Sequence, residues 1–261
     1  MNRYEGRRAL ITGGGSGIGQ ATVLRLLAEG GTVVAADVSE RGLKDTAEKA
    51  GAQAHRLSTA VVDIADETSV REGVSAAVAV LGGLDVLVNA AGILRSSHTH
   101  ETSLQEFTRV LQVNLVGTFL VIRESIPALL AGRDAAVVNF SSTSAQFAHP
   151  YMAAYAASKG GVQSMTHALA AEYARQGIRF TAVQPGSISS GMTDGSGASR
   201  QSSGPGLPED ADMSLFAKLS PAVGQGFAGP ETVASVVAML ASRDGRFITG
   251  TEIRVDGGTH F

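Results

Sequence analysis

The stretch that decides the fold is ALITGGGSGIGQATVLRLLAEGGTVVAADVS, Ala9 to Ser39. It starts as an apolar run, passes through a cluster of glycines into a helical pattern, and returns to an apolar run that ends at Asp37. A strand, a glycine-rich turn, a helix and a second strand ending in an acid form, in this order, the β-α-β unit that binds dinucleotides. The stretch therefore predicts a dinucleotide site at one edge of a parallel sheet.

The glycine motif reads Thr12-Gly13-x-x-x-Gly17-x-Gly19 and opens the helix. Glycines allow positive φ angles in the turn and let backbone N–H groups approach a ligand closely. The unpaired N–H groups at the start of a helix attract a pyrophosphate, because they donate hydrogen bonds and carry partial positive charge. The alternative, a flexible loop followed by an ordinary helix cap, is disfavoured because every part of the unit is present in order.

The acid at the end of the second strand also bears on the choice of cofactor. The Asp37 carboxylate is placed to accept hydrogen bonds from an adenosine ribose, and it would repel a 2′-phosphate. Ser16 and Val38 stand where a cation could neutralise that phosphate, and only Arg41 nearby could do so. The sequence therefore predicts NAD as the cofactor in preference to NADP.

Composition narrows the class of protein further. The chain has 261 residues, 44% of them hydrophobic, which is enough for one large core. Its net charge is −3 and it has no cysteine, which argues against nucleic acid as a partner and against disulfides or thiolate metal sites. The N-terminus shows no signal-type apolar stretch, and polar residues and glycines interrupt the apolar region Val74–Leu94. We expect a cytoplasmic protein with no membrane partner and no metal.

Short β-branched runs alternate with longer helical patterns along the whole chain. The helical patterns include Ala21–Leu27 and Leu104–Leu130. Most of the strand candidates are apolar on both faces, which is typical of a parallel sheet covered by helices on both sides. The sequence predicts a single α/β domain over residues 1–261 with a doubly wound (Rossmann) fold. Its seven candidate strands are Arg8–Ile11, Thr32–Ala36, Leu57–Val62, Val86–Asn89, Ala136–Phe140, Arg179–Val183 and Glu252–Val255.

One segment differs in composition from the rest. Ser187–Gly229 is rich in Gly, Ser, Pro and Asp, and a loop of this length inside a compact domain is usually functional or disordered. Its position next to the reactive motifs favours a substrate lid over a mobile surface loop without a function. Within it, the run DMSLFAKL (212–219) predicts a short helix.

A second motif carries candidate reaction chemistry. In YAASK, Tyr155 and Lys159 are four residues apart and share one face of a helix. A neighbouring ammonium stabilises phenolate, so we expect Lys159 and a cationic nicotinamide to lower the Tyr155 pKa and to let the phenol exchange a proton with a substrate oxygen. Upstream, AAVVNFSS predicts a strand that delivers Ser141 and Ser142 at its carboxyl end, where ligands bind in open α/β sheets.

Together these residues resemble the short-chain dehydrogenase/reductase family across nearly the whole chain. Each motif is weak alone, but their order and spacing make the resemblance specific. The matching pieces are TGGGSGIG (12–19), Asp37, Asp63 in VVDIAD, NAAG (89–92), Asn114 in QVNLVGTF, Ser142, YAASK (155–159), PGSI (185–188) and ITGTEIRVDGG (248–258).

The resemblance implies a role for each matching position. Tyr155 would be the general acid/base, Ser142 would polarise the substrate, and Lys159 would hold the nicotinamide ribose. Asn114 would help to hold a water of the proton relay. Asp63 and Ile64 would bind the adenine, Asn89 and Gly92 would lie beside the adenosine ribose, and the Ile188 backbone and Ser190 hydroxyl would hold the carboxamide. The full cofactor set is Gly13, Gly15, Ser16, Gly17, Ile18, Gly19, Asp37, Val38, Asp63, Ile64, Asn89, Ala90, Gly92, Tyr155, Lys159, Pro185, Gly186, Ile188 and Ser190.

The remaining polar candidates are assigned by position. His149 lies between Ser142 and Tyr155, so it could face the substrate, although a plain loop histidine is the alternative. His98 and His100 have no third ligand nearby, so we expect them to be solvated. The predicted substrate wall is Leu94, Ser144, Gln146, His149, Met152 and Met192. It lacks an arginine for a carboxylate, which favours an uncharged alcohol or ketone.

The sequence thus predicts an NAD-dependent oxidoreductase that interconverts a secondary alcohol and a ketone. Two alternatives stay open: an NADP-dependent 3-ketoacyl thioester reductase, and an NAD-binding sensor or scaffold without turnover. The small-residue helix around Tyr155 lets a partner backbone approach closely, and the resemblance implies a homodimer or homotetramer.

Overall fold

A single parallel sheet of seven strands forms the centre of the molecule, in the order β3-β2-β1-β4-β5-β6-β7. The computed structural model describes residues 2–194, 205–224 and 226–260. The strands are β1 (Arg8–Thr12), β2 (Thr32–Asp37), β3 (Leu57–Val61), β4 (Val86–Asn89), β5 (Ala136–Phe140), β6 (Arg179–Pro185) and β7 (Thr251–Val255). All seven predicted strands are confirmed. Central strands such as β4 and β5 are buried along their whole length, which explains why their sequences are continuous apolar runs.

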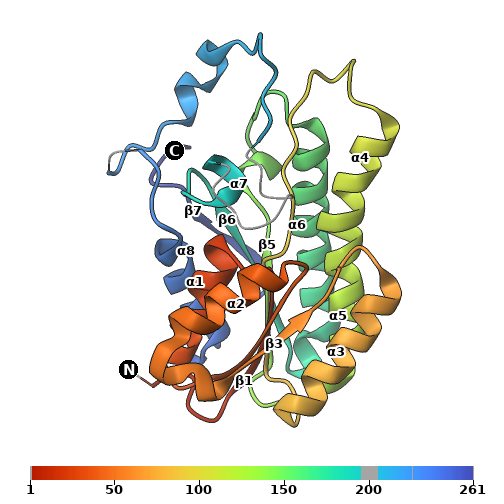
Figure 1. Cartoon of the computed structure of the whole chain (residues 1–261), viewed down its shortest axis with the longest axis vertical. Helices are drawn as coiled ribbons and strands as arrows, with labels where there is room; N and C mark the ends of the chain where they lie inside the picture. Colours follow the sequence, from red (N-terminus) through yellow and green to blue (C-terminus); the bar gives the residue numbers. More distant parts are fainter. Residues whose placement is uncertain (1, 195–204, 225, 261) are drawn as a thin grey trace.

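Helices cover both faces of the sheet (Figure 1). One face carries α1 (Gly17–Ala28), α2 (Glu40–Ala50) and α8 (Pro230–Ala241), and α1 packs along α8. The other face carries α3 (Glu67–Leu81), α4 (Leu104–Leu111), α5 (Thr118–Leu130) and α6 (Ala153–Tyr173). Two separate apolar clusters, one on each face, hold these layers to the sheet, as the predicted doubly wound architecture requires. Short elements complete the described chain: η1 (Gly51–Arg56), η3 (Thr143–Ala145), η4 (Ala174–Gln176), α7 (Gly191–Asp194), η5 (Met213–Leu219) and η6 (Arg243–Gly245).

The predicted helix Leu104–Leu130 is not uniform. A π-helical segment, η2 (Gln112–Gly117), separates α4 from α5 and contains the buried Asn114. By length and composition this continuous helix could cross a membrane, but half of its most apolar window is buried inside the molecule. Core helices of water-soluble proteins pass the same test, so this helix is weak evidence for a membrane span.

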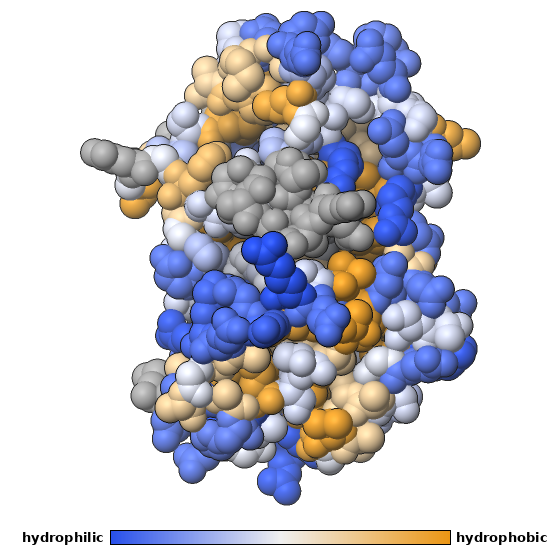
Figure 2. All heavy atoms as spheres, in the orientation of Figure 1, coloured by the Kyte–Doolittle hydropathy of each residue, from blue (hydrophilic) through white to orange (hydrophobic). Residues whose placement is uncertain are grey.

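The strand order places a binding region at one edge of the sheet. The chain leaves β1 toward β2 on one side and returns to β4 on the other, so a crevice opens at the carboxyl ends of β1 and β4. The predicted short helix of the 187–229 segment is confirmed as η5, which lies above this edge. Figure 2 shows hydrophobic residues gathered over η5, where Met213 and Leu215 are exposed. Residues 195–204 and 225 of the predicted lid lie outside the described residues.

Candidate active site

A cavity of about 580 Å³ lies along the carboxyl edge of the sheet. It runs from the glycine turn after β1, past Asp37 at the end of β2, to Tyr155 and Lys159 on α6. The segment after β6 and η5 close its other side. The arrangement brings residues far apart in the sequence into one continuous space, large enough for a nucleotide cofactor beside a small substrate.

The glycine turn fits a pyrophosphate. Gly13 has φ +71°, and a Cβ there would lie 2.6 Å from the backbone nitrogen of Ala91. A Cβ at Gly19 would overlap the carbonyl oxygen of Gly13. α1 then begins without a side-chain cap and without an acid in its first turn, whereas the Ser39 hydroxyl caps α2. The first N–H groups of α1 are thus left for an anionic ligand.

Asp37 is fixed beside this turn. Its Oδ2 accepts a hydrogen bond from the Gly15 nitrogen at 3.0 Å, and its Oδ1 accepts one from the Ser39 nitrogen at 2.8 Å. Among the described cavity-lining residues, Lys159 is the only lysine or arginine. Arg41 is exposed, does not line the cavity, and contributes to lowering the pKa of Asp45. The ribose end of the cavity therefore presents an acid with no lining cation to offset it.

Of the predicted cofactor residues, only Gly15 and Asn89 do not line the cavity. Gly15 donates to Asp37 behind the turn, and Asn89 donates from Nδ2 to Asn139 Oδ1 at 2.9 Å across neighbouring strands. Both residues thus support the wall rather than form it. Asp63 does line the cavity, and its Oδ1 accepts from the Ala65 nitrogen at 2.9 Å.

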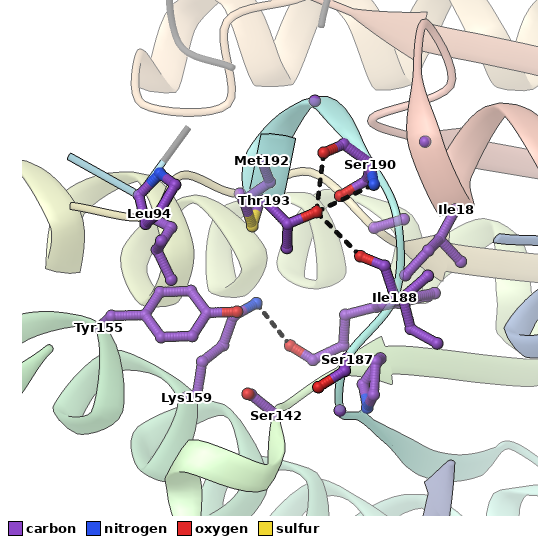
Figure 3. A pocket seen from close by; sticks show the side chains of 18 of the residues that line it. Ile18, Leu94, Ser142, Tyr155, Lys159, Ser187, Ile188, Ser190, Met192 and Thr193 are labelled. Atoms are coloured by element: carbon purple, nitrogen blue, oxygen red, sulfur yellow. Dashed lines mark hydrogen bonds between the residues drawn. The ribbon is translucent and has the colours of Figure 1, made fainter. Parts of the chain in front are cut away.

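Tyr155 lies at the buried end of the cavity, beside Ser142 (Figure 3). Burial raises the pKa of Tyr155 to about 12, and the nearby Ser142 hydroxyl lowers it only in part. Ser142 lies two residues after β5 in an extended conformation, and its Oγ accepts from the Ser144 nitrogen at 3.2 Å. The structure thus brings together the phenol and the hydroxyl that the sequence placed 13 residues apart.

Lys159 is buried on the same helix as Tyr155. Its Nζ donates to the Phe140 carbonyl oxygen at 2.8 Å and lies 5.6 Å from the centre of the Tyr155 ring. Burial lowers the pKa of Lys159 to about 8. Desolvation dominates the pKa of the Tyr155 phenol in this structure, and the expected lowering of that pKa by Lys159 together with a cationic nicotinamide stays a prediction.

Asn114 is fully buried at the π-helical segment. Its Oδ1 accepts from the Ile93 nitrogen at 2.8 Å, and its Nδ2 donates to the Ile93 carbonyl oxygen at 2.9 Å and to Ser158 Oγ at 3.0 Å. Asn114 therefore ties the segment after β4 to the helix that carries Tyr155. It does not itself line the cavity.

The segment after β6 contributes Ile188 and Ser190, as predicted, and also Thr193. Thr193 Oγ1 donates to the carbonyl oxygens of Ile188 and Ser190 and accepts from the Ser190 nitrogen at 3.0 Å (Figure 3). Sequence reasoning missed Thr193, although a hydroxyl three residues after Ser190 can close such a turn. The Ser190 hydroxyl is left free of these turn bonds.

Two of the six predicted substrate-wall residues do not line the cavity. Gln146 is directed away, because its Nε2 donates to Glu252 Oε1 at 3.0 Å. Ser144 is buried behind Ser142, to which its nitrogen donates. The other four do line it: Leu94, His149, Met152 and Met192. The substrate end also has wall residues that the sequence did not single out: Thr143, Ser187, Leu207, Met213, Phe216, Leu219, Phe227, Thr259 and His260.

The two histidines at this end have different surroundings. His149 Nδ1 donates to the Phe147 carbonyl oxygen at 3.1 Å, and its Nε2 lies 3.3 Å from Thr143 Oγ1. Burial lowers the pKa of His149, and nearby His260 contributes in the same direction. His260 comes from the C-terminal segment and lies against Phe147 with 4.0 Å between ring centres.

His98 corrects another expectation, because it is not simply solvated. Its Nε2 lies 2.9 Å from Asp210 Oδ1, and its ring meets that of Tyr151 edge-on at 5.2 Å. Tyr151 Oη in turn accepts from the Asp212 nitrogen at 2.9 Å. These contacts join the segment after β4 to the start of η5. His100 is exposed, as expected.

Comparison with known proteins identifies close relatives over the whole chain. The family model described as short chain dehydrogenase matches residues 7–201. The chain is 36% identical over 256 residues to 3-oxoacyl-[acyl-carrier-protein] reductase of Thermotoga maritima, covering 98% of each protein. It is 34% identical over 257 residues to cyclohexanol dehydrogenase of Acinetobacter sp., covering 98% of this chain and 96% of the relative.

Solved structures share the architecture. A short chain dehydrogenase from Mycobacterium paratuberculosis bound to NAD superposes with TM-score 0.86 at 31% identity, covering 98% of each chain. A short chain dehydrogenase from Burkholderia cenocepacia in complex with NADP superposes with TM-score 0.84 at 30% identity, covering 99% of each chain. Both cofactors thus occur among proteins with this fold.

Proposed function

Because the chain belongs to the short-chain dehydrogenase/reductase family, we propose that it is an NAD-dependent oxidoreductase that interconverts a secondary alcohol and a ketone. The family establishes the coarser statement, an NAD(P)-dependent oxidoreductase. The observation that carries the proposal is that the Tyr155 phenol, the Ser142 hydroxyl and Lys159 lie together at the buried end of a dinucleotide-sized cavity.

The residues at this end of the cavity can exchange a proton with the oxygen of an alcohol or ketone. With its pKa raised to about 12, Tyr155 is protonated at neutral pH and can donate to a ketone oxygen as that oxygen gains charge. Ser142 can hydrogen-bond the same oxygen and so fix the reacting carbon. Lys159, with a pKa of about 8, is mostly an ammonium at neutral pH and can hold a ribose hydroxyl. NAD, when bound, supplies the hydride acceptor at C4 of its nicotinamide.

NAD is favoured over NADP by the surroundings of Asp37. Two backbone N–H groups fix its carboxylate at the cavity wall, where it can accept from both ribose hydroxyls. A 2′-phosphate there would face this charge, and Lys159 on α6 is the only lysine or arginine that lines the cavity among the described residues.

The substrate is proposed to be uncharged. The substrate end of the cavity is walled mainly by apolar side chains, including Leu94, Met152, Met192, Leu207 and Phe216. A carboxylate or phosphate would find no arginine there among the described residues, so its desolvation would be poorly repaid.

Two other functions are less well supported. A 3-ketoacyl thioester reductase that uses NADP is suggested by the Thermotoga maritima relative, and Asp37 argues against its cofactor. A sensor without turnover has no need of the reactive set, which is complete here as Asn114, Ser142, Tyr155 and Lys159.

An assay with four pairs separates these functions. Cyclohexanol oxidation is tested with NAD and with NADP, and reduction of a 3-ketoacyl thioester is tested with NADH and with NADPH. Oxidation of the alcohol with NAD, at a higher kcat/KM than the other three pairs, is the expected result. Faster NADPH-dependent thioester reduction would replace the proposal, and binding of cofactor without turnover of any ketone or alcohol in a broader panel would favour the sensor.

We further propose a cytoplasmic homodimer or homotetramer. The exposed apolar side chains Val116 and Phe119 on η2 and α5 support an interface on that face. Light scattering that gives the monomer mass at micromolar concentration would contradict the oligomer.

A further inference from the structure

The C-terminal turn brings a histidine into the substrate end of the cavity. Asp256, at 8% exposure, accepts from the Gly258 nitrogen at 3.0 Å and from the His260 nitrogen at 3.2 Å. The same Asp256 Oδ2 lies 3.2 Å from His260 Nδ1, and the ring stacks on Phe147. His260 is therefore held by a carboxylate, a backbone bond and an aromatic face, and its ring lines the cavity.

The two ring nitrogens of His260 are not equivalent. The carboxylate at Nδ1 holds a proton there, which in the neutral ring leaves Nε2 with its lone pair. Within the described residues, Nε2 has no hydrogen-bond partner. The side chain is only 11% exposed, and His260 lines the cavity.

The neighbouring histidine does not offer the same free acceptor. Both nitrogens of His149 lie against the protein, at the Phe147 carbonyl and the Thr143 hydroxyl. The two rings are 5.9 Å apart, and apolar side chains such as Met192 form much of the surrounding wall. His260 Nε2 is thus a fixed acceptor in a mostly apolar chamber, in addition to the Ser142 and Tyr155 hydroxyls.

We propose that His260 recognises a second hydroxyl on the substrate. The substrate class is then a diol or hydroxyketone with an apolar skeleton: one oxygen reacts at Tyr155 and another donates to His260 Nε2. This inference rests on the proposed alcohol–ketone chemistry. A monohydric alcohol that displaces solvent from His260 Nε2 without pairing with it loses binding energy, whereas a matching hydroxyl recovers that energy.

The test compares alcohols in complexes that cannot turn over. Cyclohexanol and the cyclohexane-1,2-, 1,3- and 1,4-diols are titrated calorimetrically into the protein saturated with NADH. At least one diol is expected to bind roughly tenfold more tightly than cyclohexanol, the size of one net hydrogen bond. In His260→Phe, the affinities for the preferred diol and for cyclohexanol should differ by less than about twofold. His260→Gln, whose amide oxygen can accept a hydrogen bond, should keep part of the diol preference. The exposed His55→Gln is the matched control and should keep all of it.

A spectroscopic readout guards against a variant that folds poorly. In protein with ¹⁵N-labelled histidine, the His260 signals should show a protonated Nδ1 and an unprotonated Nε2, and the preferred diol should shift the Nε2 signal while cyclohexanol does not. Asp256 is a positioning residue in this account, so Asp256→Asn should change the His260 tautomer signals.

Equal binding of all the alcohols, no measurable binding of any diol, or a diol preference unchanged in His260→Phe would overturn the inference. These outcomes differ from a failure of the proposed function. If the diols bind with the His260-dependent preference but no alcohol is oxidised with NAD, the recognition stands and the proposed reaction fails.

Discussion

The carboxylate of Asp37 is held in place by the Gly15 and Ser39 N–H groups before any cofactor binds. At the residue level, we propose that this preorganised charge is the main determinant of cofactor preference. Replacing it with the shorter, neutral serine removes both the ribose acceptor and the repulsion of a 2′-phosphate.

We therefore expect Asp37→Ser to weaken NADH binding by roughly tenfold and to strengthen NADPH binding. Calorimetric titrations of both cofactors measure the two changes. Asp45→Ser, an acid on α2 outside the cavity lining, is the control and should leave the ratio unchanged. A wild-type protein that already prefers NADPH would show that a cation such as Arg41 overrides Asp37.

Lys159 illustrates a conflict between stability and function. Burial lowers its pKa from 10.5 to about 8, so below pH 8 the folded protein contains a buried ammonium that the unfolded chain would expose to water. For a lysine whose pKa is lowered on folding, this destabilisation is complete below the folded pKa and disappears as the pH rises through the unfolded pKa.

Lys159→Met is therefore expected to raise the free energy of unfolding at pH 7 by about 1–2 kcal/mol, less than the full pKa shift because the Phe140 carbonyl loses its donor. This increase in the free energy of unfolding should become smaller as the pH approaches 10. Denaturant unfolding at both pH values measures it, with the exposed Lys44→Met as control. A variant less stable than the wild type at pH 7 would show that the ammonium stabilises the fold, contrary to this account.

At the scale of elements, the contact between His98 and Asp210 holds the segment leading to η5 over the cavity. The hydrogen bond to Asp210 raises the pKa of His98, and the same bond lowers the pKa of Asp210. The ion pair forms only when His98 is protonated and Asp210 is ionised. It is lost as the pH rises through the raised His98 pKa, and again as the pH falls through the lowered Asp210 pKa. Glu101 and His100 are the other titratable neighbours.

Hydrogen exchange of residues 208–219, corrected for intrinsic rates, should therefore lose protection roughly two- to fivefold as the pH rises from 6 to 9. His98→Gln should remove this pH step, because a neutral amide cannot form the ion pair. His100→Gln, altered two residues away at an exposed side chain, should retain it. An identical pH step in all three proteins would place the pH-sensitive contact elsewhere.

The elements also show where sequence reasoning succeeds and where it stops. The central strands β4 and β5 could be predicted because their burial on both faces produces continuous apolar runs. The π-helical segment at Asn114 could not, because its apolar pattern continues that of the flanking helices. Gln146 was assigned to the wall from its closeness in sequence to Ser142, but its partner Glu252 is 106 residues away and turns it outward.

At the scale of the whole molecule, the fold and the cofactor half of the cavity follow from local motifs. The glycine turn, Asp37 and the Tyr155–Lys159 pair each depend on spacing within one β-α unit or one helix. The substrate half depends on the C-terminal turn and on η5, which meet the cavity only in three dimensions. For this reason no local pattern indicated His260.

In the proposed reaction, the Tyr155 hydroxyl serves the chemistry and not the binding of the cofactor. The most direct measurement pairs NADH titration with turnover in Tyr155→Phe, whose ring fills the same buried space. We expect the NADH affinity to stay within about threefold of the wild type. Turnover should fall by roughly 10²- to 10⁴-fold, the range for a lost acid/base group. Turnover within tenfold of the wild type, with NADH binding intact, would contradict it.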